Sequence, residues 1–233
     1  MCEIIAAAFP APRPFAEIAD FVTKLEVYGL GGFGWGVAWL ENDGKVQIHR
    51  DTGRYVDQGA SDEQLLATRS ARFLVHLRRP SRLSTTALPD TQPFGDGERA
   101  FCHNGFLARA YEMRPEYADR LEGRADSEVG WVYLQDRLAA GADPEAALAE
   151  LDRTFGGRVN LGYLGGDGTL AVYTRNGENA LWRFGLGDAE LASSGLHSDD
   201  ESVFDLVFPA ATDRCRLPQA SGATVAGPVH DAA

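Results

Sequence analysis

The chain has 233 residues, 44% hydrophobic and 24% charged, and its 34 acidic against 22 basic side chains give a net charge of -12. This length and composition predict one globular domain and exclude global disorder. The acidic balance argues against binding to nucleic acids or anionic membranes, and no apolar run reaches the ~20 residues of a membrane helix. Because the first residues also lack the basic start of a secretory signal, we expect a cytoplasmic protein.

The N-terminal part of the chain predicts alternating strands and helices. Residues 2–9 form a short apolar run, typical of a buried strand, that ends in a proline-rich turn at 10–14. Apolar residues at helical spacing predict an amphipathic helix over 14–27. Strands at 37–40 and 46–49, joined by an Asn-Asp-Gly turn, predict a hairpin.

The middle of the chain continues this pattern. A capping box at 61–64 opens a short helix that reaches Ala71, and an apolar strand follows at 73–77. Residues 79–97 predict a loop, and 100–103 a short strand that ends at an Asn-Gly turn. Apolar residues at helical spacing predict two helices over 126–140 and 144–155, and each is followed directly by a glycine, Gly141 and Gly156.

After residue 158 the spacing of the apolar residues changes from that of helices to that of strands. Short apolar runs separated by turn residues predict strands at 159–164, 170–174, 180–184 and 190–193. The last residues are rich in Ala, Ser, Gly and Pro, so we expect one domain over 2–217 and a mobile tail over 218–233.

A glycine-rich stretch contains the pattern G-x-G-x-x-G as Gly29, Gly31 and Gly34. The dinucleotide-binding fingerprint needs a strand before the glycines and a helix after them, because the helix N-terminus holds the pyrophosphate. Here the helix comes first and the strand second. We therefore interpret the stretch as a loop whose backbone packs closely against another part of the protein.

Cysteine and histidine usage indicates reduced thiols. The cysteines are Cys2, Cys102 and Cys215, and such an odd, sparse set does not form a disulfide framework. No CxxC or HxxxH spacing occurs, so we expect neither a metal site nor a cofactor. An alternative hypothesis is a redox protein in which Cys2 and Cys102 form a disulfide.

Cys2 is the most informative of these residues. Removal of Met1 would leave Cys2 at the N-terminus, where its thiol and its own α-amine share one residue. An α-amine with a pKa of ~7.7–8.0 can act as a base near neutral pH, next to a thiol of ~8.5. The alternative is an inert cysteine buried on the first strand.

Three further positions combine polar groups with the ends of strands or helices. Asn104 and the Gly105 N–H could stabilise an oxyanion together, although Asn-Gly is also a common turn. Arg78 could clamp a carboxylate where a strand enters a loop, or it is a solvated arginine beside Arg79. Asp126 begins a helix, so its carboxylate either caps that helix or pairs with a substrate ammonium.

The order of these motifs resembles the glutaminase domain of class II glutamine amidotransferases, which are N-terminal nucleophile (Ntn) hydrolases. The resemblance covers about residues 1–140 by motif and the remainder by its hairpin-rich pattern. It is closest to the short stand-alone members of that family. The motifs that carry it are Cys2, Gly34-Trp35-Gly36, His76-Leu77-Arg78, His103-Asn104-Gly105 and Asp126-Ser127-Glu128.

The resemblance implies an α+β fold, a four-layer αββα sandwich with two antiparallel β-sheets. It also implies a role for each matching residue. Cys2 would be the nucleophile and, through its freed amine, the base, while Asn104 and Gly105 would form the oxyanion hole. Arg78 would hold the α-carboxylate of the substrate and Asp126 its α-ammonium.

The implied activity is cleavage of the γ-amide of glutamine or of a γ-glutamyl compound through a Cys2 thioester, with release of ammonia or an amine. Since 233 residues leave no room for a synthase domain, we expect either hydrolysis alone or transfer of ammonia to a separate synthase subunit. The alternative is a non-catalytic amino-acid-binding or regulatory module on the same fold, because fold does not fix function.

Overall fold

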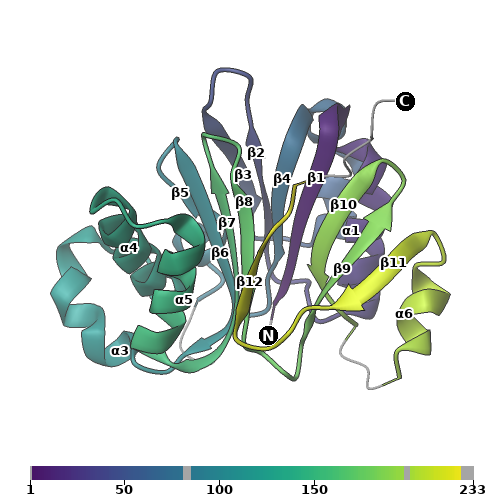
Figure 1. Cartoon of the computed structure of the whole chain (residues 1–233). Coiled ribbons are helices and arrows are strands. Elements are labelled where there is room, and N and C mark those ends of the chain that lie inside the picture. Colours follow the sequence, from purple (N-terminus) through teal and green to yellow (C-terminus); the bar gives the residue numbers. More distant parts are fainter. Residues whose placement is uncertain (1, 81–84, 197–199, 227–233) are drawn as a thin grey trace.

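The protein is described here by a computed structural model, which covers residues 2–80, 85–196 and 200–226. Two antiparallel β-sheets pack face to face, and helices cover the outer face of each sheet, so the molecule has four layers in the order αββα (Figure 1). The predicted α+β sandwich is therefore confirmed. Among the described residues, no helix has both the length and the apolar character needed to cross a bilayer.

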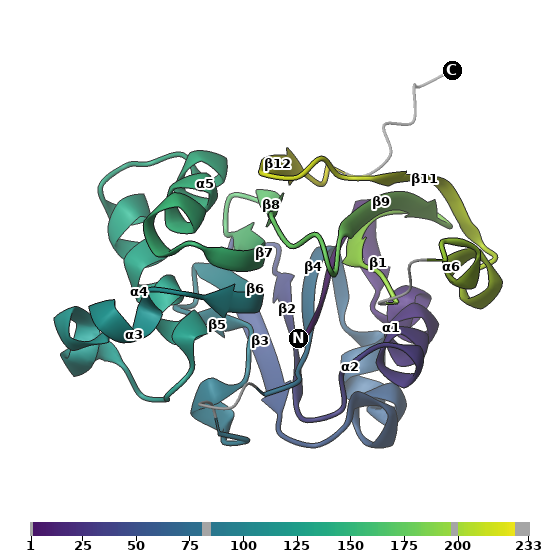
Figure 2. The ribbon, with the colours of Figure 1, turned by 90° about the horizontal axis from the view of Figure 1, so that it is seen from below.

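The larger sheet has seven strands in the order β11-β9-β10-β1-β4-β2-β3. Its strands are β1 (Glu3–Pro14), β2 (Trp35–Leu40), β3 (Val46–Asp51), β4 (Arg69–Leu77), β9 (Leu181–Leu186), β10 (Ala189–Ser194) and β11 (Ala211–Arg216). The helices on its outer side are α1 (Ala16–Tyr28), α2 (Glu63–Ala67) and α6 (Ser202–Val207) (Figures 1 and 2). Central strand β1 is apolar on both faces, because Ile5 and Ala7 pack toward the helices while Ile4 and Ala6 pack toward the other sheet.

The smaller sheet has five strands in the order β12-β8-β7-β6-β5. Its strands are β5 (Phe94–Gly95), β6 (Arg99–Leu107), β7 (Gly157–Gly165), β8 (Leu170–Thr174) and β12 (Ser221–Thr224). The helices beside it are α3 (Ala110–Met113), α4 (Asp126–Ala139) and α5 (Pro144–Phe155). Short 3₁₀ helices in the connections span Tyr55–Asp57, Gly59–Ser61, Leu88–Asp90 and Arg114–Arg120.

Most of the predicted elements are present, and the differences lie at their ends. The predicted turn at 10–14 is wrong, because β1 continues to Pro14 through a register shift after Ala8. The helix predicted to reach Ala71 ends at Ala67, since β4 begins at Arg69, and its N-cap is Asp62. The predicted loop at 79–97 contains a 3₁₀ helix and strand β5 in its second half, while residues 81–84 lie outside the described residues.

The C-terminal segment adds an edge strand to the smaller sheet. Residues 221–224, which the sequence placed in the tail, form β12 and pair with β8. Residues 227–233 lie outside the described residues. At the opposite end of the chain, β1, a central strand of the larger sheet, begins where loops from both sheets meet (Figure 2). The fold therefore holds the start of β1, and with it Cys2, at the seam between the sheets.

Candidate active site

Cys2 lies directly before β1 and is held by groups from both sheets. Its side chain is buried, with 9% of its surface exposed. The thiol accepts a hydrogen bond from the Arg79 N–H (3.2 Å) and lies 3.3 Å from the Arg79 carbonyl oxygen. Burial raises the pKa of the Cys2 thiol, and the Arg79 N–H together with the Arg78 charge acts in the opposite direction.

The side chains that the sequence singled out meet around this thiol. Cys2, Arg78, Gly105 and Asp126 line one small cavity of about 20 Å³. Asn104 lies behind Cys2, and its Nδ2 donates a hydrogen bond to the Cys2 carbonyl oxygen. The structure therefore brings together all five predicted residues, although they come from four different parts of the chain.

Arg78 follows β4 and is 2% exposed. Its Nη2 donates to the Thr85 carbonyl oxygen, whereas its Nη1 has no hydrogen-bond partner among the described residues. Burial lowers the pKa of Arg78. The interpretation of Arg78 as a solvated surface residue is thus wrong. A buried guanidinium with one open nitrogen is suited to receive an anionic group.

The glycine-rich stretch before β2 provides the close packing that its sequence predicts. The Arg78 N–H donates to the Gly34 carbonyl oxygen (2.8 Å), and the Phe33 N–H donates to the Arg78 carbonyl oxygen (3.1 Å). A Cβ at Gly34 would lie 3.3 Å from the Asp51 carbonyl oxygen and in contact with the Arg78 side chain, and Gly34 has a φ of 120°. A glycine at this position lets the loop lie directly against Arg78.

Asp126 is the first residue of α4 and does not cap it. The N-cap is Ala125, which makes no side-chain cap bond, so the capping interpretation of Asp126 is wrong. One carboxylate oxygen, Oδ2, accepts from the Leu107 N–H (2.8 Å), and Oδ1 has a long contact of 3.4 Å with Ser127. Asp126 as a whole is 5% exposed, and its Oδ1 has spare hydrogen-bonding capacity beside the cavity.

Asn104 and Gly105 lie inside β6 and do not form the predicted turn. Strand β6 continues to Leu107 because it stays paired with β7, with Asn104 opposite Asn160 and Gly105 opposite Val159. Gly105 has a φ of 133°, and a Cβ there would collide with the Arg158 carbonyl oxygen. This position therefore requires glycine.

Sequence reasoning missed two asparagines in the loop between β8 and β9. Asn179 donates from Nδ2 to the Cys2 carbonyl oxygen (3.3 Å) and to the Glu3 carboxylate (3.1 Å). Asn176 donates to Asn104 Oδ1 (3.4 Å). In the sequence the two residues flank Gly177-Glu178 and are typical of an ordinary turn, so no signal distinguished them.

Asp90 is a further missed residue, and it connects the two ends of the cavity. Its Oδ1 accepts from the backbone N–H groups of Arg124 (2.5 Å) and Ala125 (2.8 Å), directly before Asp126. Its Oδ2 accepts from the Thr85 N–H (2.8 Å) and hydroxyl (2.5 Å), and the Thr85 carbonyl oxygen receives Arg78. Burial would raise the pKa of Asp90, but these hydrogen bonds outweigh it and hold the pKa below its usual value.

Two buried histidines lie at the site, and His103 is part of the cavity wall. His103 contacts Ser127 through Nδ1 (3.1 Å), and burial lowers its pKa. Burial, together with the nearby charge of Arg78, lowers the pKa of His76 to about 3, and neither of its ring nitrogens has a partner among the described residues. Both imidazoles are therefore neutral near pH 7.

The three cysteines are free thiols in the structure. The disulfide between Cys2 and Cys102 that a redox protein would need is not formed. Cys102 is instead fully buried in the core between the sheets.

Fold and site together define a class of protein. Two antiparallel sheets lie between helical layers, and a cysteine at the start of the central strand meets polar groups from both sheets. This is the architecture of the Ntn hydrolases, here with a cysteine directly before the central strand.

The family follows from the comparison with known sequences. The sequence pattern of the class II glutamine amidotransferases matches residues 1–191, so the chain belongs to this family. The predicted resemblance is confirmed. No curated protein sequence matches the chain in the corresponding comparison.

Several solved structures share the fold at low sequence identity. Glutamine phosphoribosylpyrophosphate amidotransferase from B. subtilis, complexed with ADP and GMP, matches with a TM-score of 0.71 and 16% identity over 96% of this chain and 48% of that one. A structure described as the allosteric regulatory enzyme of purine biosynthesis matches with a TM-score of 0.67 and 19% identity over 94% and 45%. This chain thus spans about half the length of these two proteins.

A third structure is closer to this chain in length. The glutamine aminotransferase class-II domain protein from Silicibacter pomeroyi matches with a TM-score of 0.55 and 18% identity, over 83% of this chain and 88% of that one. At these identities the likeness establishes the shared fold.

Proposed function

We propose that the protein hydrolyses the γ-amide of glutamine or of a γ-glutamyl compound through a thioester on Cys2. The observation that carries this proposal is the shared cavity, in which the Cys2 thiol, the Arg78 guanidinium and the Asp126 carboxylate meet. Arg78 Nη1 has no partner among the described residues, and Asp126 Oδ1 has only a long contact with Ser127. These two open atoms complement the carboxylate and the ammonium of an amino-acid head group.

The chemistry follows from the atoms at hand. With Met1 removed, the Cys2 α-amine takes the thiol proton, and the sulfur attacks the γ-carbonyl carbon. The oxyanion that forms is stabilised by the Gly105 N–H and the Asn104 amide, and each such donor contributes ~3–4 kcal/mol to transition-state stabilisation. The C–N bond then breaks, the nitrogen leaves with the proton, and water hydrolyses the thioester to release glutamate.

Substrate binding requires a rearrangement on the thiol side. A cavity of about 20 Å³ has room for about one water molecule and not for a glutamine side chain. Arg79 and Pro80 form part of its wall, and the Arg79 N–H donates a hydrogen bond to the Cys2 sulfur. We infer that substrate displaces this backbone and replaces its hydrogen bond to the thiol.

The test combines intact mass with turnover. We expect a chain that begins at Cys2 and releases glutamate from glutamine or a small γ-glutamyl amide, and a Cys2→Ala variant without activity. A glutamine analogue with an electrophilic side chain should label Cys2 stoichiometrically. Retention of Met1 in an active enzyme would refute the proposed base, and binding of glutamine without labelling or turnover would favour the non-catalytic amino-acid-binding module.

The fate of released ammonia is a second part of the proposal. Ammonia either leaves to solvent or passes to a separate synthase subunit, and the chain spans about half the length of the first two solved relatives. Glutamate release that rises on addition of a synthase partner would favour transfer.

A further inference from the structure

A pocket of about 300 Å³ adjoins the thiol cavity at Gly105. Gly105 lines both spaces, and the wall of the pocket is completed, among the described residues, by Phe106, Gly157, Arg158 and Asn176. These residues lie at the paired ends of β6 and β7 and in the loop after β8. Because the thiol cavity itself holds only about 20 Å³, the neighbouring pocket offers far more room for a ligand.

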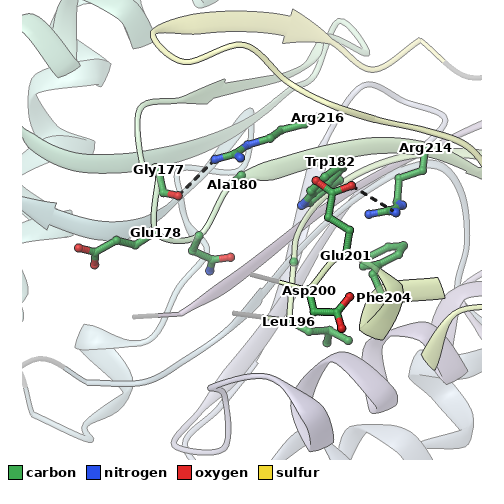
Figure 3. A pocket seen from close by; sticks show the side chains of 12 residues that line it. Gly177, Glu178, Ala180, Trp182, Leu196, Asp200, Glu201, Phe204, Arg214 and Arg216 are labelled. Carbon is green, nitrogen blue, oxygen red and sulfur yellow. Dashed lines mark hydrogen bonds and ion pairs between the residues drawn. The ribbon is translucent and has the colours of Figure 1, made fainter. Parts of the chain in front are cut away.

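Its connection to the thiol cavity distinguishes this pocket from the one in Figure 3. The pocket in Figure 3 lies between the β8–β9 loop, α6 and β11, and among the described residues it has no lining residue in common with the thiol cavity. Figure 3 also shows Glu201 paired with Arg214, and Arg216 donating to the Gly177 carbonyl oxygen (3.3 Å). Of the two, the pocket at Gly105 is the one that continues the candidate active site.

The wall of the pocket at Gly105 is mostly apolar. Phe106 lies in β6 and is 45% exposed, so part of its ring is open to a ligand. Gly157 adds backbone without a side chain. Arg158 also lines the pocket, and its guanidinium forms an ion pair with Glu178. Since this positive charge is paired, the pocket favours an uncharged, apolar group over an ion.

Asn176 joins the pocket to the asparagine proposed to bind the oxyanion. It is fully buried, it lines the pocket, and its Nδ2 donates to Asn104 Oδ1 (3.4 Å). Asn104 in turn donates to the Cys2 carbonyl oxygen. The Oδ1 of Asn176 has no hydrogen-bond partner among the described residues, so the otherwise apolar pocket offers one buried acceptor for an N–H group.

We propose that this pocket binds the amine half of the substrate, and that this amine carries an uncharged apolar group about the size of a phenyl ring. The inference rests on the proposed function, in which Arg78 and Asp126 hold the head group and Gly105 binds the oxyanion. Arg78 and Asp126 line the thiol cavity and not the pocket, whereas Gly105 lines both, so the part of the amide beyond the γ-carbonyl is directed past Gly105 into the pocket. An apolar cavity of about 150 Å³ can bind benzene, so about 300 Å³ is sufficient for such a group.

The reaction then differs from glutamine hydrolysis only in the group that leaves. The γ-amide C–N bond breaks, and the amine departs as R–NH₂ with the proton that the Cys2 α-amine took from the thiol. Water then hydrolyses the thioester to glutamate. Glutamine itself releases ammonia, which does not fill the pocket. The preferred substrates are therefore γ-glutamyl amides of arylalkyl amines.

Three synthetic amides with the same two-carbon chain on the nitrogen test this assignment. They are the γ-glutamyl amides of ethylamine, 2-phenylethylamine and 2-aminoethanesulfonate, whose outer groups are small, apolar and charged. We expect kcat/KM for the phenylethyl amide to exceed that for the ethyl amide by about tenfold, and the sulfonate amide to be the poorest. A phenylethyl amide no better than either of the others would overturn the pocket assignment, while hydrolysis of glutamine would keep the proposed function.

A pair of variants locates the preference. Phe106→Ala should reduce the ratio of phenylethyl to ethyl kcat/KM from about tenfold to about twofold, because the apolar contact with the ring is lost. Leu206→Ala is the matched control, since Leu206 is also an exposed apolar side chain (82%) but lies in α6, on the outer side of the larger sheet. An unchanged ratio in the Phe106 variant, or an equal fall in both variants, would overturn the assignment and favour a protein contact for Phe106.

Fragment binding separates this inference from the proposed function. If no amide is hydrolysed, the proposed function fails, and two fragments without the head group, N-(2-phenylethyl)acetamide and N-ethylacetamide, still test the pocket by ligand-observed NMR. Binding of the phenylethyl fragment, weakened by Phe106→Ala and not by Leu206→Ala, would support the pocket. Absence of this binding, or equal binding of both fragments, would overturn it.

Discussion

Asp90 offers a sharp test of how the site is organised, because both of its carboxylate oxygens are engaged by groups of the protein. Its carboxylate ties Thr85, which receives Arg78, to Arg124 and Ala125, which lead into Asp126. We predict that Asp90→Asn loosens both groups that hold the amino-acid head group. Asp90 would thus act as a positioning residue.

The size of the effect follows from the hydrogen bonds. An asparagine keeps one carbonyl oxygen and can retain the two bonds to Arg124 and Ala125, but its NH₂ then faces the Thr85 N–H, which is also a donor. One buried N–H left without an acceptor costs ~1–3 kcal/mol, and the remaining bonds lose their charge assistance. We expect a loss of about 3 kcal/mol, which corresponds to ~6–12 °C in Tm for a domain of this size.

The assay compares KM with kcat and follows stability with pH. Glutamine KM should rise by about tenfold while kcat changes less, since the variant disturbs binding and not the sulfur. The pKa of Asp90 is lower in the folded state than in the unfolded chain, so its stabilisation is present above pH ~4 and is lost as the pH falls through the folded value. The difference in stability between wild type and variant should therefore shrink in acid.

A matched control is available in Asp62→Asn. Asp62 also accepts two backbone N–H groups, from Gln64 (2.9 Å) and Leu65 (3.1 Å), but as an N-cap remote from the cavity. Asparagine caps helices as well as aspartate does, so this variant should lose only a few tenths of a kcal/mol. An Asp90 variant with wild-type Tm and KM would refute the argument that Asp90 positions Arg78 and Asp126.

Two further predictions concern the strands beneath the site. Gly105→Ala should remove turnover and destabilise the fold by ~1–3 kcal/mol, because alanine resists a φ of 133° and its Cβ meets the Arg158 carbonyl oxygen; wild-type glutamate release and thermal stability would contradict this. His76 has a pKa of about 3 in the folded state, whereas an ordinary histidine has a pKa of 6.5, so the protein becomes less stable as the pH falls through that window. In denaturant titrations, His76→Leu should reduce the slope of the unfolding free energy against pH by the equivalent of up to one proton. An unchanged slope would show that His76 is protonated in the folded protein without loss of stability.

The sequence predicted those parts of the site whose chemistry is visible in single residues. A cysteine beside the N-terminus, an arginine at a strand end and an aspartate at a helix start each suggest a role, and Cys2, Arg78 and Asp126 do line one cavity. It could not predict Asn179, because a turn asparagine becomes a partner of Cys2 only when β8 and β9 join opposite sheets. Asp90 was hidden for a similar reason, since two of its partners, Arg124 and Ala125, lie 34 and 35 residues away in the chain.

The errors in the fold have a common physical cause. Local turn signals were overridden by strand pairing at two places, the prolines at 10–14 and the Asn-Gly pair in β6. Strand β1 passes its prolines through a register shift, and Gly105 adopts a positive φ that lets β6 remain paired with β7. In both cases many ladder hydrogen bonds outweigh one local preference, and the short-range pattern contains no information about the partner strand.

The position of Cys2 depends on both sheets at once. Its sulfur accepts a hydrogen bond from the backbone N–H of Arg79, which follows β4 of the larger sheet. Its carbonyl oxygen accepts one from Asn104 in β6 of the smaller sheet. Asn179, in the loop that crosses from one sheet to the other, completes the set, and Asn160 of β7 in turn donates to its carbonyl oxygen (2.6 Å). A relative shift of the sheets would therefore separate the sulfur from the Gly105 N–H, so the packing between the two sheets is itself a determinant of the proposed chemistry.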